Sequence, residues 1–75
     1  MKEYISIRDS IMAEVISLQE KYPELRFGQA VYNVTTGLFP STKILNGTDD
    51  DCFYDDKKVN QFIAKATIIA NENIG

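Results

Sequence analysis

The chain of 75 residues has no histidine, no tryptophan and a single cysteine, Cys52. One cysteine forms no internal disulfide, and the lack of histidine excludes most zinc and transition-metal sites. Cys52 also lacks an activating base, and the acids around it would raise the pKa of its thiol. We therefore expect Cys52 to be a packing residue, and we predict a protein that is not an enzyme, with no catalytic residues, metal or cofactor.

Positive charge is also scarce. Eight lysines and arginines stand against eleven acids, which gives a net charge of −3, and the basic residues form no run. A DNA or RNA binder needs a basic face to neutralise phosphates, so we expect no nucleic-acid partner. No apolar segment approaches transmembrane length, and the first residues do not resemble a signal peptide. The expected location is the cytoplasm, without a membrane partner.

The composition is that of one folded domain over residues 1–75, with 44% hydrophobic and 25% charged residues. Apolar spacings of three and four predict a first helix over residues 2–21. Beside its main apolar stripe lies a second apolar flank, formed by Ile5, Met12 and Ile16. Two interpretations stay open: the helix is buried on two sides of one core, or the flank pairs with another copy of the chain.

A second helix is predicted over residues 23–36. The residue before a proline is pushed out of helical conformation, so Tyr22 is an expected corner and Pro23 suits the first position of the next helix. Gly28 would then lie inside a helix, where glycine costs roughly 1 kcal/mol against alanine. Either a neighbouring helix approaches closely there, or the fold tolerates the glycine. The predicted core face of this helix is Phe27, Ala30, Val31 and Val34.

Residues 37–53 are predicted to form a long loop, because glycine, proline and an asparagine–glycine pair punctuate them. A loop of this length is a candidate for mobility or function. Its apolar residues are expected to attach parts of it to the core: Leu38, Phe39, Ile44 and Leu45. A last helix is predicted over residues 55–71, with Asp55 as its N-cap. The expected fold is all-α, a three-helix domain with a long loop before the last helix.

Acidic residues in the loop and at the start of the last helix are the most obvious polar feature: Asp49, Asp50, Asp51, Asp55 and Asp56. They do not fit a calcium-binding EF-hand loop, because Asp51 stands where glycine is needed and Lys57 where glutamate is needed. We interpret them as helix-capping and solvating groups.

Three side chains of the second helix are candidate binding groups. Arg26 is expected to contact either a carboxylate or phosphate of a ligand, or an acid of the same chain such as Asp55 or Asp56. Gln29 and Asn33 share one helix face, where they contact a ligand or hydrogen-bond the backbone of the loop. The candidate clamp or ligand site comprises Arg26, Gln29, Asn33, Tyr54, Asp55 and Asp56.

Two segments of the chain carry a family resemblance. Residues 23–33 follow the pattern P-[DE]-L-R-[FL]-G-Q-x-x-x-N, and residues 51–56 follow the D-P-F-Y-x-x part of a second pattern, D-P-F-Y-x-x-D/S, with Cys52 in place of proline. In this order, the segments resemble a family of small uncharacterised bacterial and bacteriophage proteins. The resemblance implies a small helical protein of phage or mobile-element origin, and it implies no activity.

The leading hypothesis is a non-catalytic interaction protein that forms a homodimer or binds another protein through the flank Ile5, Met12 and Ile16. One alternative is a small-ligand or enzyme-accessory protein that uses Arg26, Gln29 and Asn33. Another is an inhibitor whose acidic loop binds a basic partner.

Overall fold

The computed structural model describes residues 6–72 of the chain. Three α-helices and two short 3-10 helices follow one another, and no β-strand occurs within these residues. They are α1 (Arg8–Lys21), α2 (Phe27–Leu38), η1 (Pro40–Leu45), η2 (Asp56–Lys58) and α3 (Val59–Glu72). The predicted all-α fold is therefore confirmed. Between residues 6 and 72, no helix is both long and apolar enough to cross a membrane.

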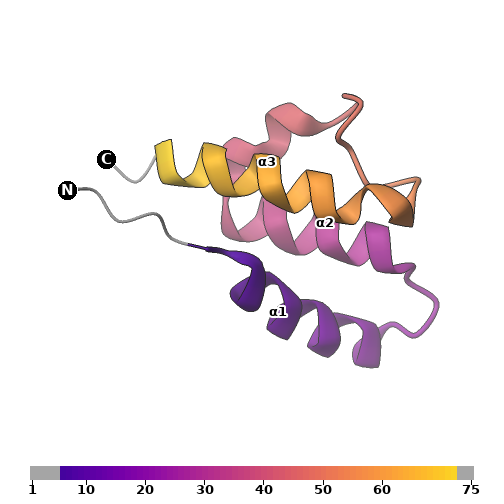
Figure 1. Ribbon diagram of the computed structural model, residues 1–75. Helices are drawn as coiled ribbons and strands as arrows, with labels where there is room; N and C mark the ends of the chain where they lie inside the picture. The colour runs from indigo at the N-terminus through magenta and orange to yellow at the C-terminus, as the bar shows by residue number, and fades with distance from the viewer. Residues whose placement is uncertain (1–5, 73–75) are drawn as a thin grey trace.

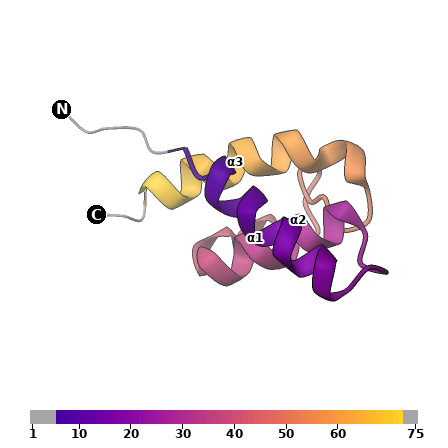
Figure 2. The same cartoon turned by 90° about the horizontal axis from the view of Figure 1, so that it is seen from below.

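Helix α2 is the central element. It lies between α1 and α3, and η1 packs on both α2 and α3 (Figure 1). Seen from below, α1 is the layer nearest the viewer, with α2 and α3 behind it (Figure 2). The core is built from every layer: Ile7, Ile11, Val15, Ala30, Val31, Leu45, Cys52, Val59, Phe62, Ile63, Ala66 and Ala70.

Both prolines end a helix in the same way. Tyr22 before Pro23 has φ −128° and ψ 81°, and Phe39 before Pro40 has φ −130° and ψ 81°. Each donates its N–H to a carbonyl four residues earlier at 2.8 Å, which closes the last helical turn. The predicted corner at Tyr22 is confirmed. The second helix extends past residue 36 to Leu38, because its end is set by the residue before Pro40.

The first two helices start later than predicted. α1 begins at Arg8, and Ile7 is its N-cap. Ile7 is buried, so the apolar spacing that predicted the helix continues beyond the first helical residue. The part of the prediction over residues 2–5 lies outside the described residues. The prediction that Pro23 opens the second helix was wrong, since residues 23–25 form a turn and α2 begins at Phe27. This turn is held by the side chain of Gln19, which donates to the carbonyl of Leu25 at 3.1 Å.

The segment predicted as a loop contains a helix. In η1, the buried Thr42 donates its hydroxyl to the Phe39 carbonyl at 2.7 Å. Leu45 is buried and Phe39 packs against the core, as expected, whereas Ile44 and Leu38 are exposed by 71% and 46%. The expectation that those two attach the loop to the core was wrong: Leu38 is the exposed last residue of α2, and Ile44 is an exposed residue of η1.

The last helix is divided. Asp55 accepts a hydrogen bond from the Lys57 N–H at 3.0 Å, so it is an N-cap as predicted, but of η2. α3 then begins at Val59, and Glu72 is its last residue. In the predicted core face of the second helix, Ala30 and Val31 are fully buried and Val34 is half-buried. Phe27 is 37% exposed, because it lies at the open first turn of α2.

Candidate functional site

The two sequence segments, residues 23–33 and 51–56, meet at the start of α2. The Gly28 N–H donates to the Asp56 carboxylate at 2.9 Å, and the Cys52 thiol donates to the Gly28 carbonyl at 3.3 Å. The guanidinium of Arg26 donates to the Phe53 carbonyl at 3.0 Å. We call this group of five residues, Arg26, Gly28, Cys52, Phe53 and Asp56, the interlock. It ties two segments more than twenty residues apart into one unit.

Gly28 is required at the interlock because the opposite segment approaches its Cα. A methyl group there would collide with the carbonyl oxygen of Cys52 and lie 2.7 Å from a carboxylate oxygen of Asp56. Of the two explanations for this glycine, close approach is therefore the correct one. The neighbours are the backbone of Cys52, before η2, and Asp56, the first residue of the short helix η2.

Asp56 caps α2 from a distance. Gly28 is the second residue of α2, where the N–H has no partner within the helix. The carboxylate supplies that partner and also interacts favourably with the positive end of the helix dipole. On the same helical turn, the side-chain carbonyl of Gln29 accepts a longer, 3.4 Å hydrogen bond from the Arg26 N–H. The start of α2 is thus stabilised by one remote and one local acceptor.

The candidate residues do not form one site. Arg26 contacts the backbone carbonyl of Phe53, whereas Asp55 and Asp56 accept from the backbone N–H groups of Lys57 and Gly28. Gln29 and Asn33 line a separate hollow of about 430 Å³ between α1 and α2, together with Leu18, Tyr22, Glu24 and Leu25. The exposed Asn33 has no side-chain hydrogen bond to the long loop among residues 6–72.

Tyr54 and Asp55 face a different hollow of about 340 Å³, lined also by Asn46, Gly47, Thr48, Asp51 and Lys58. Tyr54 is 80% exposed, and its ring packs edge-on against Phe53 with centroids 4.7 Å apart. Phe53 in turn packs edge-on against Tyr32 at 5.4 Å. This aromatic series connects the exposed Tyr54 to the core.

The acids of the loop hold its backbone. One oxygen of Asp51 accepts from the Gly47 N–H at 2.8 Å, and the other accepts from the Phe53 N–H at 2.9 Å. Asp50 accepts from the side chain of Gln61 at 3.1 Å. Across residues 6–72, no three such side chains are grouped as a metal ion requires. Asp50 and Asp51 therefore hold the loop instead of only solvating it, whereas Asp55 caps a helix as predicted.

The sequence did not predict the contact between Asn46 and Tyr32, which attaches the loop to α2. The side-chain amide of Asn46 donates to the Tyr32 hydroxyl at 2.8 Å, and Gly47 follows with φ +76°. The asparagine–glycine pair did mark the turn. Nothing in the local pattern connected that turn to Tyr32, which is fourteen residues earlier.

The geometry leaves Cys52 without a nucleophilic role. Its side chain is fully buried, and burial together with the Asp51 carboxylate raises the pKa of the thiol from 9.0 to about 12. The thiolate, which is the nucleophilic form, is therefore scarce at pH 8. The interlock is therefore a structural unit.

We expect the Cys52 thiol to be labelled by iodoacetamide at pH 8 at least a hundredfold more slowly in the native chain than in urea, because labelling needs an exposed thiolate. Mass spectrometry of timed samples gives both rates. Equal labelling rates in the native and unfolded chains would contradict this assignment.

The stability contributed by this thiol is complete below pH 9 and declines as the pH rises towards 12, since the unfolded thiol ionises first.

Comparisons of the chain with protein-family models, with curated proteins and with solved structures give no match.

Proposed function

We propose that this chain is a non-catalytic interaction protein that forms a homodimer through the outer flank of α1. The observation that carries the proposal is Ile16, which is 60% exposed in the middle of a helix. Met12, one turn earlier, is half-buried and continues the same flank. Ile5, the third residue assigned to this flank, lies outside the described residues.

The arrangement of the layers supports this surface. α1 packs on the fold through α2, with Ile11 and Val15 buried on its inner side. Its opposite side forms the outside of the molecule (Figure 1). An apolar side chain placed there gains about 25 cal/mol for each Å² that a partner removes from water. A protein partner explains this placement better than nucleic acid does, given the net charge of −3.

The ligand-site alternative has less support. The donors and acceptors of the interlock are directed at backbone groups of the chain itself, as the bonds from Arg26 to Phe53 and from Gly28 to Asp56 indicate. The acidic-loop alternative is weakened in the same way, since both oxygens of Asp51 accept from the backbone. A cytoplasmic location and a phage or mobile-element origin stay proposals, which rest on the unpaired cysteine and on the two sequence segments.

We expect Ile16→Glu to weaken dimerisation at least tenfold while the monomer stays folded, because it places a charge in the centre of the contact. Sedimentation equilibrium measures the dissociation constant, and circular dichroism checks the fold. The matched control is Ile44→Glu, which changes another exposed isoleucine, on η1, and should leave the dimer unchanged. A dimer that tolerates Ile16→Glu as well as Ile44→Glu would place the interface elsewhere.

A further inference from the structure

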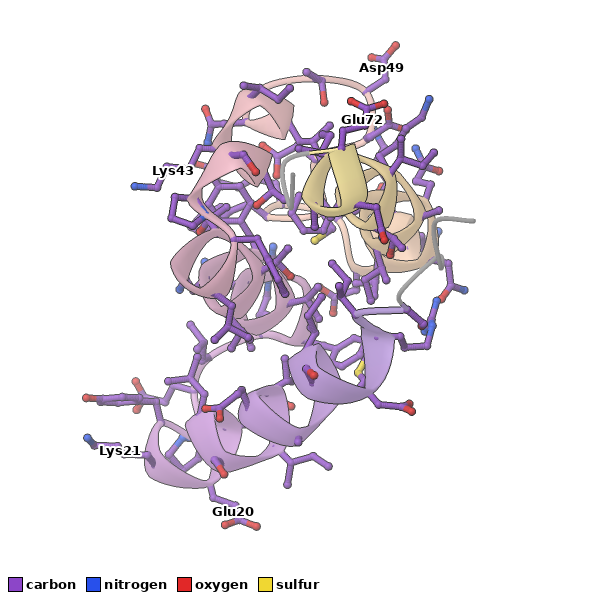
Figure 3. The ribbon with its side chains drawn as sticks, turned by 90° about the vertical axis from the view of Figure 1, so that its left-hand side faces the viewer. Glu20, Lys21, Lys43, Asp49 and Glu72 are labelled. Atoms are coloured by element: carbon purple, nitrogen blue, oxygen red, sulfur yellow. The ribbon has the colours of Figure 1, made fainter. Side chains whose placement is uncertain are left out.

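The outer side of α1 carries two neighbouring rows of side chains, in which each residue lies four positions after the previous one. Such residues are adjacent on a helix surface. The first row is Arg8, Met12, Ile16 and Glu20, and the second is Asp9, Ala13, Ser17 and Lys21. All eight are exposed except the half-buried Met12. Glu20 projects away from α2 and α3 (Figure 3).

Each row begins with one charge and ends with the opposite charge. The first row runs from arginine to glutamate, and the second from aspartate to lysine. When a second copy of the helix runs in the opposite direction, the positive end of a row therefore faces the negative end of the same row. The middle of the surface is apolar or small, since Met12 and Ile16 lie beside Ala13 and Ser17.

We propose that α1 pairs in antiparallel orientation with α1 of a second copy, about a two-fold axis near the middle of the helix. This inference rests on the proposed function and specifies its geometry. Arg8 then lies opposite Glu20 of the second copy. Met12 packs against Ile16 of the second copy, and each contact occurs twice because of the symmetry.

A parallel pair is disfavoured by the same charges. It would bring Arg8 against Arg8 and Glu20 against Glu20 of the second copy, and like charges at an interface select against the wrong arrangement. Ala13 and Ser17 favour close contact in the antiparallel pair, because small side chains let two helix backbones approach. Rows at spacings of four are also the ridges that interdigitate in the commonest class of helix packing.

Arg8 is available for this contact although it already has one partner. Its guanidinium donates one hydrogen bond, to the side-chain oxygen of Asn60 at 3.0 Å. A guanidinium has five N–H donors. The remaining donors have no partner within residues 6–72, so one arginine can join α3 of its own chain and a carboxylate of the second copy.

The length of the surface predicts a weak dimer. α1 has 14 residues. At 1.5 Å per residue it is about 21 Å long. A pair of such helices buries less than the roughly 1,200–2,000 Å² of stable complexes, so we expect a dissociation constant in the micromolar range.

Charge reversal tests the antiparallel pairing. Arg8→Glu and Glu20→Arg each turn two attractive pairs into two repulsive ones, so each should weaken dimerisation roughly tenfold. The double variant with both changes restores both pairs and should return the dissociation constant to within about twofold of the starting value. Sedimentation equilibrium at low ionic strength measures all four proteins.

Two control variants isolate the effect. Lys43→Glu changes the net charge as Arg8→Glu does, but on η1, where Lys43 points away from α1 (Figure 3). Asn60→Ala removes the hydrogen bond of Arg8 within the chain and keeps its charge. Both controls should dimerise normally.

The outcomes separate the two proposals. A dimer that is insensitive to the single reversals, or that the double reversal does not restore, overturns the antiparallel pairing and leaves the proposed function standing. If the unchanged chain is a monomer at all concentrations, both proposals fail. Weakening by Lys43→Glu equal to that by Arg8→Glu also overturns the pairing, because net charge alone then explains the effect.

Discussion

Gly28→Ala is expected to destabilise the chain by about 2–4 kcal/mol, a large part of the roughly 4–11 kcal/mol available to a domain of this size. The added methyl group collides with the backbone oxygen of Cys52 and crowds the carboxylate of Asp56. To relieve these contacts, the segment before η2 must move away, and the bond from the Gly28 N–H to Asp56 lengthens or breaks. This loss exceeds the gain of roughly 1 kcal/mol that alanine brings to a helix.

Gly37→Ala is the matched control. Gly37 also lies in α2, it has no positive φ, and a methyl group added there meets nothing within 4 Å. Alanine should therefore stabilise the chain by about 0.5–1 kcal/mol. Urea unfolding followed by circular dichroism gives both values. Two alanine variants that are equally stable would show that the interlock does not constrain residue 28.

Phe62→Ala is expected to cost about 3–5 kcal/mol, a large part of the roughly 4–11 kcal/mol available to the domain. Phe62 is among the largest fully buried side chains, and its ring centroid lies 5.8 Å from that of Tyr32. Truncation leaves a cavity between α3 and α2 and removes the inner end of the aromatic series that supports Phe53 and Tyr54.

Ile68→Ala tests whether that loss comes from burial. Ile68 lies on the same helix, α3, but is 45% exposed, so its truncation should cost less than about 1 kcal/mol. Thermal and urea unfolding of both variants give the comparison. If Ile68→Ala destabilises the chain as much as Phe62→Ala, the core does not centre on Phe62.

Local signals in the sequence predicted the parts of the fold that local physics controls. Pro23 predicted that the first helix ends at Tyr22, and the short acidic side chain of Asp55 predicted an N-cap at that residue. The start of α2 was not predictable in this way, because its second N–H is capped by Asp56, 28 residues later. The helix η1 was missed because the hydroxyl of Thr42, a residue of low helix propensity, stabilises it through the Phe39 carbonyl.

The candidate site was predictable only as two segments that meet. Their order suggested contact, which the structure confirms. The predicted pairing of Arg26 with Asp55 or Asp56 was wrong, because the guanidinium donates to the Phe53 carbonyl while both carboxylates accept from backbone N–H groups. Spacing alone did not reveal that Gln29 and Asn33 face one hollow while Tyr54 and Asp55 face another. Which face of α2 each neighbour covers depends on the packing of α1 and on the path of the chain before η2.

Sedimentation equilibrium of the unchanged chain tests the central claim, that the outer flank of α1 joins two copies. With a chain mass of 8.5 kDa, we predict an apparent mass that rises towards twice that value as the concentration passes through the micromolar range. An apparent mass of 8.5 kDa at every concentration up to the high micromolar range would contradict the claim.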